Sequence, residues 1–173
     1  MTVYALGDQV PNIDPSAFLH PDCVVIGSVT IGAESTIWPG AVLRADDGEI
    51  VVGARTSIQD GSVLHTTAVS PTVIGDDCVI GHMVHLEGCT IESKSLVGNG
   101  SVVLHGAIIR TGSLVGSNAV VPNGMEVPTG MMALGVPAKL RPASPELARM
   151  VGRAVDSYAA RGARYRDELR KIV

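Results

Sequence analysis

Aromatic residues are scarce in this chain. Only 3% of its 173 residues are aromatic whereas 46% are hydrophobic, so the core has to be built from Val, Ile, Leu and Ala. No stretch approaches the ~18 consecutive apolar residues of a membrane-spanning helix, and the N-terminal residues lack the basic region and apolar run of a signal peptide. The three cysteines are too few for a disulfide framework. We therefore expect a cytoplasmic protein with free thiols and no membrane partner.

An excess of positive charge is also missing. The chain has 13 Lys and Arg residues against 17 Asp and Glu residues, which gives a formal net charge of −4. A basic surface of the kind that binds nucleic acid is therefore not expected. The length fits one domain of ordinary size with a real core.

Aliphatic residues recur at a spacing of six along most of the chain. They are Ile13, Leu19, Val25, Ile31, Ile37, Leu43, Val52, Ile58, Leu64, Ile74, Ile80, Leu86, Ile91, Val97, Val103, Ile109, Val115, Val121 and Val127. A sustained hexapeptide period predicts a parallel β-helix, in which each short strand buries one residue and then turns a corner. We expect an all-β domain over residues 1–141, with about six to seven coils of three hexads each.

The last part of the chain, residues 142–173, changes period. Apolar residues recur there at steps of three and four, which is typical of an amphipathic α-helix. Pro142 and Pro145 stand at its start, and Ser144 is a candidate N-cap. We expect this helix to pack along one side of the β-helix or on a neighbouring subunit.

Stacking three hexads per coil brings chemically active side chains together. The residue after each buried aliphatic residue points outward, so Arg44, His65 and Glu87 should stack on one outer face. Neighbouring parallel strands lie ~4.8 Å apart, which lets His65 and Glu87 converge on one ion. His82 lies ~16 Å farther back along extended chain, at ~3.3 Å per residue, so it would have to come from a neighbouring subunit. His85 faces outward near the same site, as a ligand or as a neighbour of the ligands.

A metal shared in this way implies a homotrimer with ring-closing interfaces. The six-residue period is interrupted in three places, within residues 43–52, 64–74 and 86–91. All three interruptions flank the expected site. We interpret them as loops, the part of a rigid scaffold where function tends to concentrate.

Five motifs together resemble the γ-class carbonic anhydrase family: LRAD at 43–46, IQDGSVLH at 58–65, IGH at 80–82, GCTI at 88–91 and ALGVPAK at 133–139. The resemblance implies a left-handed β-helix and a homotrimer that hydrates CO₂ to bicarbonate with a metal-bound hydroxide at a subunit interface. The metal implied by the resemblance is Zn²⁺, with Fe²⁺ or Co²⁺ as alternatives. Family members hold it with three histidines, two from one subunit and one from the next. His65 and His82 occupy two of these positions.

The third histidine of the family is replaced by Glu87 here. Zn²⁺ accepts two histidines and a glutamate, and the same set suits Fe²⁺. An anionic ligand donates more charge than an imidazole, so we expect weakened or altered hydrolytic power. Alternatively His85 is the third ligand and Glu87 is a base or a supporting residue.

Other roles follow from the resemblance by position. Arg44 and Asp46 match an Arg-x-Asp pair that forms a salt bridge between subunits. Gln59 and Asp60 match a Gln-Asp pair, whose Gln contacts the metal-bound water or bicarbonate. The loop between His65 and Ile74 lacks the carboxylate of the most active members.

Two other functions compete with the anhydrase. One is a hexapeptide-repeat acyltransferase that uses acetyl-CoA, and the other is a non-catalytic binding or scaffold protein of the same family. Whether the chain is an enzyme is therefore left open. We interpret Cys78 and Cys89 as core residues, and His20 and His105 as ordinary surface histidines.

Overall fold

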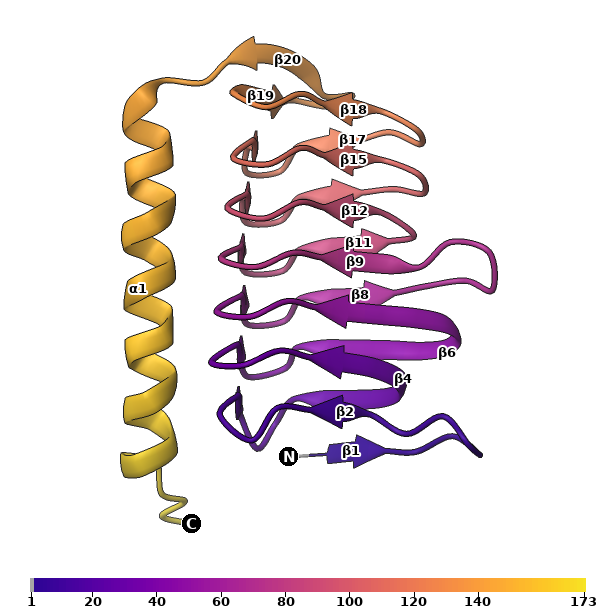
Figure 1. The fold of residues 1–173 in the computed structure, drawn as a ribbon, viewed down its shortest axis with the longest axis vertical. Coiled ribbons are helices and arrows are strands. Elements are labelled where there is room, and N and C mark those ends of the chain that lie inside the picture. The colour runs from indigo at the N-terminus through magenta and orange to yellow at the C-terminus, as the bar shows by residue number, and fades with distance from the viewer. Residues whose placement is uncertain (1) are drawn as a thin grey trace.

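The computed structural model describes residues 2–173 and shows a left-handed parallel β-helix of about seven turns with one C-terminal helix. The coils stack into a three-sided prism, and the helix runs along one side of it over nearly its full length (Figure 1). The fold class expected from the six-residue period and the family resemblance is confirmed.

The strands fall on three faces of the prism. The first face contains β1 (Thr2–Tyr4), β4 (Val24–Ile31), β6 (Val42–Val52), β8 (Val63–His65), β11 (His85–Glu87), β14 (Val102–Val103) and β17 (Val120–Val121). The second face contains β2 (Asn12–Ile13), β9 (Thr72–Ile74), β12 (Thr90–Ile91), β15 (Ile108–Ile109) and β18 (Glu126–Val127), together with the later parts of β4 and β6. The third face contains β3 (Phe18–Leu19), β5 (Thr36–Ile37), β7 (Ser57–Ile58), β10 (Val79–Ile80), β13 (Leu96–Val97), β16 (Leu114–Val115), β19 (Met131–Leu134) and β20 (Lys139–Pro142).

The interior is built from the aliphatic residues of the repeat. Leu43, Leu64 and Leu86 are fully buried and paired in register across β6, β8 and β11. The small residues at the corners are buried as well, and the hydroxyl of Ser62 donates to the carbonyl of Gly81 at 2.7 Å. Because every coil buries its own aliphatic residues against those above and below, the core is continuous along the prism axis.

Two of the interruptions in the six-residue period differ from each other: one is extended strand and the other is a loop. The extra residues at 45–49 were expected to form a loop, but they lie inside β6, which continues unbroken from Val42 to Val52. Strand β4 pairs with both ends of this long strand through a register shift between Gly27 and Val29, so the added residues are absorbed as extended chain. The segment 66–71 does leave the prism as a short loop, with Val69 almost fully exposed at its tip.

Helix α1 (Pro145–Glu168) packs on β3, β5, β7 and β10. Its buried residues are Val151, Val155 and Gly162. Near its end the ring of Tyr165 meets that of Trp38 edge to face, with 5.1 Å between the centroids. Ser144 is the N-cap residue as expected, although its side chain makes no capping hydrogen bond.

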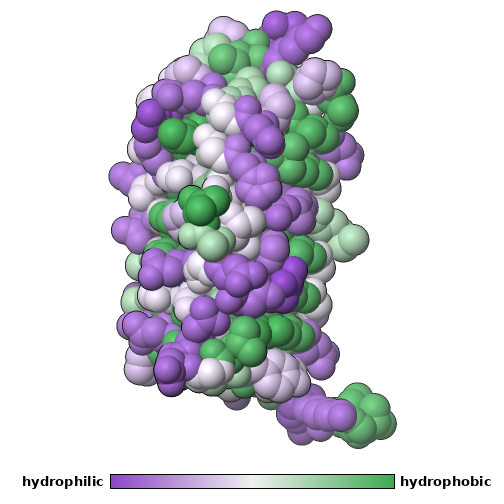
Figure 2. Space-filling model, turned by 90° about the vertical axis from the view of Figure 1, so that its right-hand side faces the viewer, coloured by the Kyte–Doolittle hydropathy of each residue, from purple (hydrophilic) through white to green (hydrophobic). Residues whose placement is uncertain are grey.

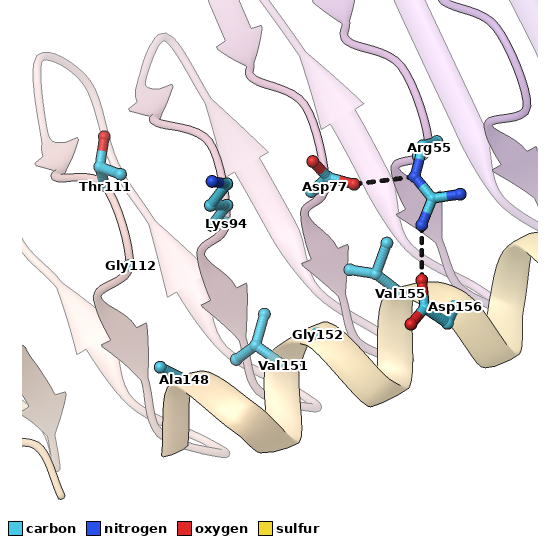
Figure 3. Close-up of a pocket in the computed structure, with 10 residues that line it drawn as sticks. All are labelled: Arg55, Asp77, Lys94, Thr111, Gly112, Ala148, Val151, Gly152, Val155 and Asp156. Atoms are coloured by element: carbon cyan, nitrogen blue, oxygen red, sulfur yellow. Dashed lines mark hydrogen bonds and ion pairs between the residues drawn. The ribbon is translucent and has the colours of Figure 1, made fainter. Parts of the chain in front are cut away.

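Ion pairs also join the helix to one corner of the prism (Figure 3). Arg55 donates to Asp77 at 3.0 Å and to Asp156 of α1 at 2.6 Å. Beside these residues a groove of about 340 Å³ follows the helix and is lined by Val151 and the exposed Lys94. All of these charges are partly exposed, so they contribute little to stability compared with the apolar contacts of α1.

The edge of the prism away from α1 interleaves hydrophilic and hydrophobic residues along its whole length (Figure 2). In the described part of the chain, no helix combines the length and the apolar character needed to cross a bilayer.

Candidate metal centre

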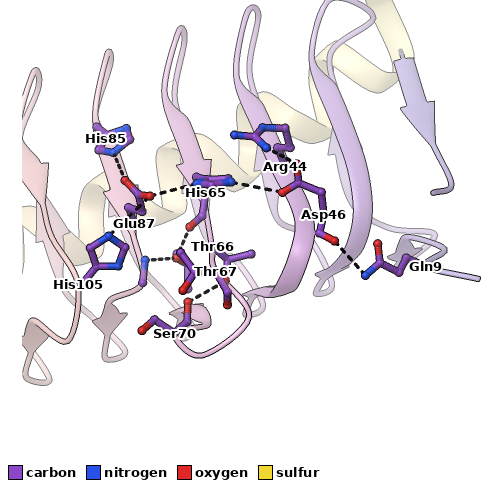
Figure 4. A network of polar contacts seen from close by, with 12 residues as sticks. Gln9, Arg44, Asp46, His65, Thr66, Thr67, Ser70, His85, Glu87 and His105 are labelled. Atoms are coloured by element: carbon purple, nitrogen blue, oxygen red, sulfur yellow. Dashed lines mark hydrogen bonds and ion pairs between the residues drawn. The ribbon is translucent and has the colours of Figure 1, made fainter. Parts of the chain in front are cut away.

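The register of the first face brings the expected site residues together. Arg44 pairs with His65 across β6 and β8, and His65 pairs with Glu87 across β8 and β11. The three side chains therefore stack on neighbouring coils, as the repeat predicts. They form part of a network of polar contacts on this face (Figure 4).

The imidazole of His65 lies between two carboxylates. Its Nδ1 is 3.2 Å from Oε1 of Glu87 and its Nε2 is 3.3 Å from Oδ1 of Asp46. Asp46 is held in turn by the guanidinium of Arg44 within the same chain. A neutral imidazole has one N–H and can donate to only one of these carboxylates. The other carboxylate must find its donor elsewhere, and Asp46 has one in Arg44.

The carboxylate of Glu87 contacts three imidazoles. Besides His65, the Nε2 of His85 lies 3.1 Å from Oε2, and the Nε2 of His105 lies 3.6 Å from Oε1. His105, interpreted from the sequence as an ordinary surface histidine, is 39% exposed and also lies against Glu87. We call Asp46, His65, His85, Glu87 and His105 the imidazole–carboxylate cluster.

The two carboxylates of the cluster are ionised well below neutral pH. Hydrogen bonds from His65 and His85 lower the pKa of Glu87 from its ordinary value. For Asp46, partial burial would raise the pKa, but the hydrogen bond from Arg44 and the contact with His65 outweigh it, so this pKa is also lowered. The cluster is thus negative enough to attract a cation.

The remaining residues that the sequence assigns to the site, Gln59, Asp60 and His82, lie at a different corner of the prism. Gln59 and Asp60 follow β7, and Gly81 and His82 follow β10 one coil later. Nδ1 of His82 is 2.9 Å from Oδ2 of Asp60. Gln59 is only 3% exposed and lines a hollow of about 280 Å³ together with His82. Within one chain these residues form a second group, separate from His65 and Glu87.

His65 and Glu87 have the chemistry of metal ligands, but one chain does not supply a complete set of ligands around them. Among residues 2–173, no group of three or more His, Cys, Asp or Glu side chains is arranged to hold a metal ion. Two imidazoles and a carboxylate are nevertheless a set that Zn²⁺ and Fe²⁺ accept. Metal-binding histidines usually pass their other ring N–H to a carboxylate, and Asp46 and Asp60 stand at that place for His65 and His82. The residues present therefore fit a metal shared between chains.

Cysteine does not take part in this chemistry. Cys78 and Cys89 are buried in the core, as predicted, and burial raises the pKa of each thiol to about 12. A thiol with so high a pKa is neutral at physiological pH and is a poor metal ligand.

Comparisons with known proteins agree with the repeat. The family model described as bacterial transferase hexapeptide (six repeats) matches residues 11–45 and 71–105. Two solved structures are similar over nearly the whole chain. A Bacillus cereus protein provisionally named an acetyltransferase is 33% identical with a TM-score of 0.94, covering 96% of this chain and 97% of that one. A hexapeptide transferase family protein from Anaplasma phagocytophilum is 36% identical with a TM-score of 0.87, covering 90% and 92%.

Curated relatives match about three-fifths of the chain. Gamma carbonic anhydrase 1, mitochondrial, from Arabidopsis thaliana is 42% identical over an alignment of 108 residues that covers 59% of this chain and 39% of the relative. The carnitine operon protein CaiE of Escherichia coli is 42% identical over 103 residues, which are 60% of this chain and 53% of the relative. The alignment thus spans about two-fifths to one half of these relatives.

The fold and the six-residue repeat define a hexapeptide-repeat protein with a partly buried imidazole–carboxylate cluster on one face. The chain belongs to this family. Over about three-fifths of its length the chain is also similar to a γ-carbonic anhydrase and to CaiE.

Proposed function

We propose that this chain is the protomer of a metal-dependent trimer that interconverts CO₂ and bicarbonate. The observation that carries the proposal is the pairing of His65 with Glu87 on neighbouring coils, with Asp46 on the far side of His65. The γ-carbonic anhydrases among its relatives support the same reaction.

The metal would be held by His65 and Glu87 of one protomer and by His82 of the partner subunit. The expected metal is Zn²⁺, with Fe²⁺ or Co²⁺ as alternatives. When bound, such an ion acts as a Lewis acid that activates water near neutral pH.

The protein residues would prepare this site in three ways. Asp46 accepts a hydrogen bond from His65, and Asp60 lies 2.9 Å from Nδ1 of His82; these contacts fix the ring orientations. His85 donates to Oε2 of Glu87 and so acts beside the ligands rather than as one of them. Gln59 borders the hollow next to His82, where its amide can donate to a bicarbonate oxygen.

The first face offers a surface for the partner subunits. Val24, Val42, Val63, Val102 and Val120 form one outward column with His85 across its strands. Helix α1 packs on the third face and leaves this column uncovered. An apolar column beside the cluster favours a second copy as the occupant, because that copy would also bring His82.

Metal content and CO₂ hydration test the proposal. Both are measured on purified wild type and on Glu87→Ala, His85→Ala and Glu146→Ala, the last being a control on the exposed face of α1. We expect stoichiometric metal and measurable hydration in wild type and the control, no metal in Glu87→Ala, and retained metal in His85→Ala. A trimer that never binds an ion, with or without added Zn²⁺, Co²⁺ or Fe²⁺, contradicts the proposal. Bound metal without hydration favours a binding or scaffold role.

Acyl transfer is the second candidate, favoured by the likeness to the Bacillus cereus structure. Calorimetric titration with acetyl-CoA separates the two functions. Binding of acetyl-CoA without CO₂ hydration would identify the chain as an acyltransferase.

A further inference from the structure

The ring of His105 lies beside the proposed metal site but has no role in it so far. Its Nε2 is 3.6 Å from Oε1 of Glu87, the oxygen that also faces Nδ1 of His65 at 3.2 Å. His65 belongs to the coil before Glu87 and His105 to the coil after it. The carboxylate therefore lies between two imidazoles along the prism axis, while His85 contacts its other oxygen (Figure 4).

The backbone places the ring of His105 at this position. Gly88 has φ +60°, and a Cβ built on it would lie 2.5 Å from Nδ1 of His105 and 2.8 Å from Cβ of Ser70. The amide of Gly106 donates to the carbonyl of Gly88 at 2.7 Å and ties the two coils together. The absent side chain of Gly88 thus leaves the space that the imidazole fills, between the loop at 66–71 and Glu87.

A glutamate ligand needs more support than a histidine ligand. Its side chain has one more rotatable bond than that of histidine, so more conformational freedom is lost when it is held in one orientation. Neighbouring hydrogen-bonding groups reduce this freedom before the metal binds. In this chain the extra neighbours are His85, which hydrogen-bonds to Oε2, and His105, whose Nε2 lies within ion-pair distance of Oε1 at 3.6 Å.

We propose that His105 is a positioning residue that, together with His85, holds the carboxylate of Glu87 in the orientation that binds the metal. This inference rests on the proposed function, because it assumes that Glu87 is a ligand.

Zinc affinity of the metal-free full-length protein tests the inference. Calorimetry with Zn²⁺ compares wild type, His105→Leu, His105→Gln and His20→Leu, a histidine on the first coils that contacts Asp22. We expect His105→Leu to weaken Zn²⁺ binding ~10-fold to 100-fold, as other losses of ligand-supporting groups do. His105→Gln retains an N–H donor near the position of Nε2 and should keep most of the affinity, and His20→Leu should keep all of it.

A second background shows whether His105 acts through Glu87. In Glu87→His, which restores an imidazole at the ligand position, the added change His105→Leu should not weaken Zn²⁺ binding. Equal weakening in both backgrounds, or none in the first, would overturn the inference.

A wild-type protein that binds none of Zn²⁺, Co²⁺ and Fe²⁺ would end the proposed function by itself. The crystal structure of metal-free His105→Leu then decides the inference. A displaced or disordered Glu87 carboxylate supports the positioning role, and an unmoved carboxylate overturns it.

Discussion

Nδ1 of His65 and Oε1 of Glu87 lie 3.2 Å apart although 22 residues separate them in the chain. The distance follows from the coil: β8 and β11 are neighbours in the first face, and both residues stand directly after a buried leucine. The candidate site is therefore part of the repeat itself, and its geometry depends on the packing of the coils.

That dependence predicts the effect of shortening a buried leucine. Leu86→Ala removes a fully buried side chain next to Glu87 and should lower the free energy of unfolding by ~2–5 kcal/mol. Val69→Ala changes a side chain that is 89% exposed and should leave the free energy of unfolding unchanged within about 0.5 kcal/mol. Urea denaturation followed by circular dichroism measures both. Equal effects of the two substitutions would contradict this account of the core.

Two glycines of α1 should respond to alanine with opposite signs. A Cβ at Gly162 would lie 2.4 Å from Cγ2 of Thr36, whose hydroxyl is fixed by Ser57 and Trp38, so Gly162→Ala should destabilise the protein. A Cβ at Gly152 would meet nothing within 4 Å, so Gly152→Ala should stabilise the protein by ~0.5–1 kcal/mol through helix propensity. Thermal unfolding of the two variants gives the comparison. A Gly162→Ala protein that is as stable as wild type would show that α1 does not pack closely on β5.

Gly88 should tolerate alanine less well than Gly124. Both have positive φ, +60° and +67°, so both variants carry the cost of a left-handed residue, ~1 kcal/mol. Only at Gly88 would the new Cβ meet other atoms, those of His105 and Ser70. We expect a larger loss of unfolding free energy in Gly88→Ala and, in addition, weaker Zn²⁺ binding, which calorimetry measures. Identical behaviour of the two variants would show that His105 can move without consequence.

The carboxylate of Glu87 should make stability depend on pH in the acid range. Hydrogen bonds from His65 and His85 lower its pKa in the folded state, so its contribution is fully present above the ordinary value of 4.5 and is lost as the pH falls through the folded value. The difference in unfolding free energy between wild type and Glu87→Gln should therefore be larger at about pH 7 than at about pH 3. Glu146→Gln serves as a control for the loss of an exposed carboxylate. A difference that does not shrink on acidification would contradict the assigned hydrogen bonds.

The stacked residues of the site can be predicted from the sequence, but the place of His105 at a corner of the prism cannot. Arg44, His65 and Glu87 each follow a buried leucine, and the period of the repeat converts that position into a column. His105 was missed because it stands at a turn, where the period does not say which way a side chain points. The sequence does contain a clue to its position. Because the step from residue 86 to 91 is one residue short, His105 stands opposite Gly88 on the next coil, not opposite Glu87.

The sequence alone determined the β-helix, its buried residues and the pairing of His65 with Glu87. These features repeat at every coil, and a period of six leaves each aliphatic side chain only one direction in which it can be buried. The tertiary structure decided what does not repeat: the continuous β6, the Arg44–Asp46 pair within one chain, and the third imidazole at Glu87. It also separated Gln59 and His82 from the cluster, because residues at different corners of a rigid prism cannot approach one another within one chain.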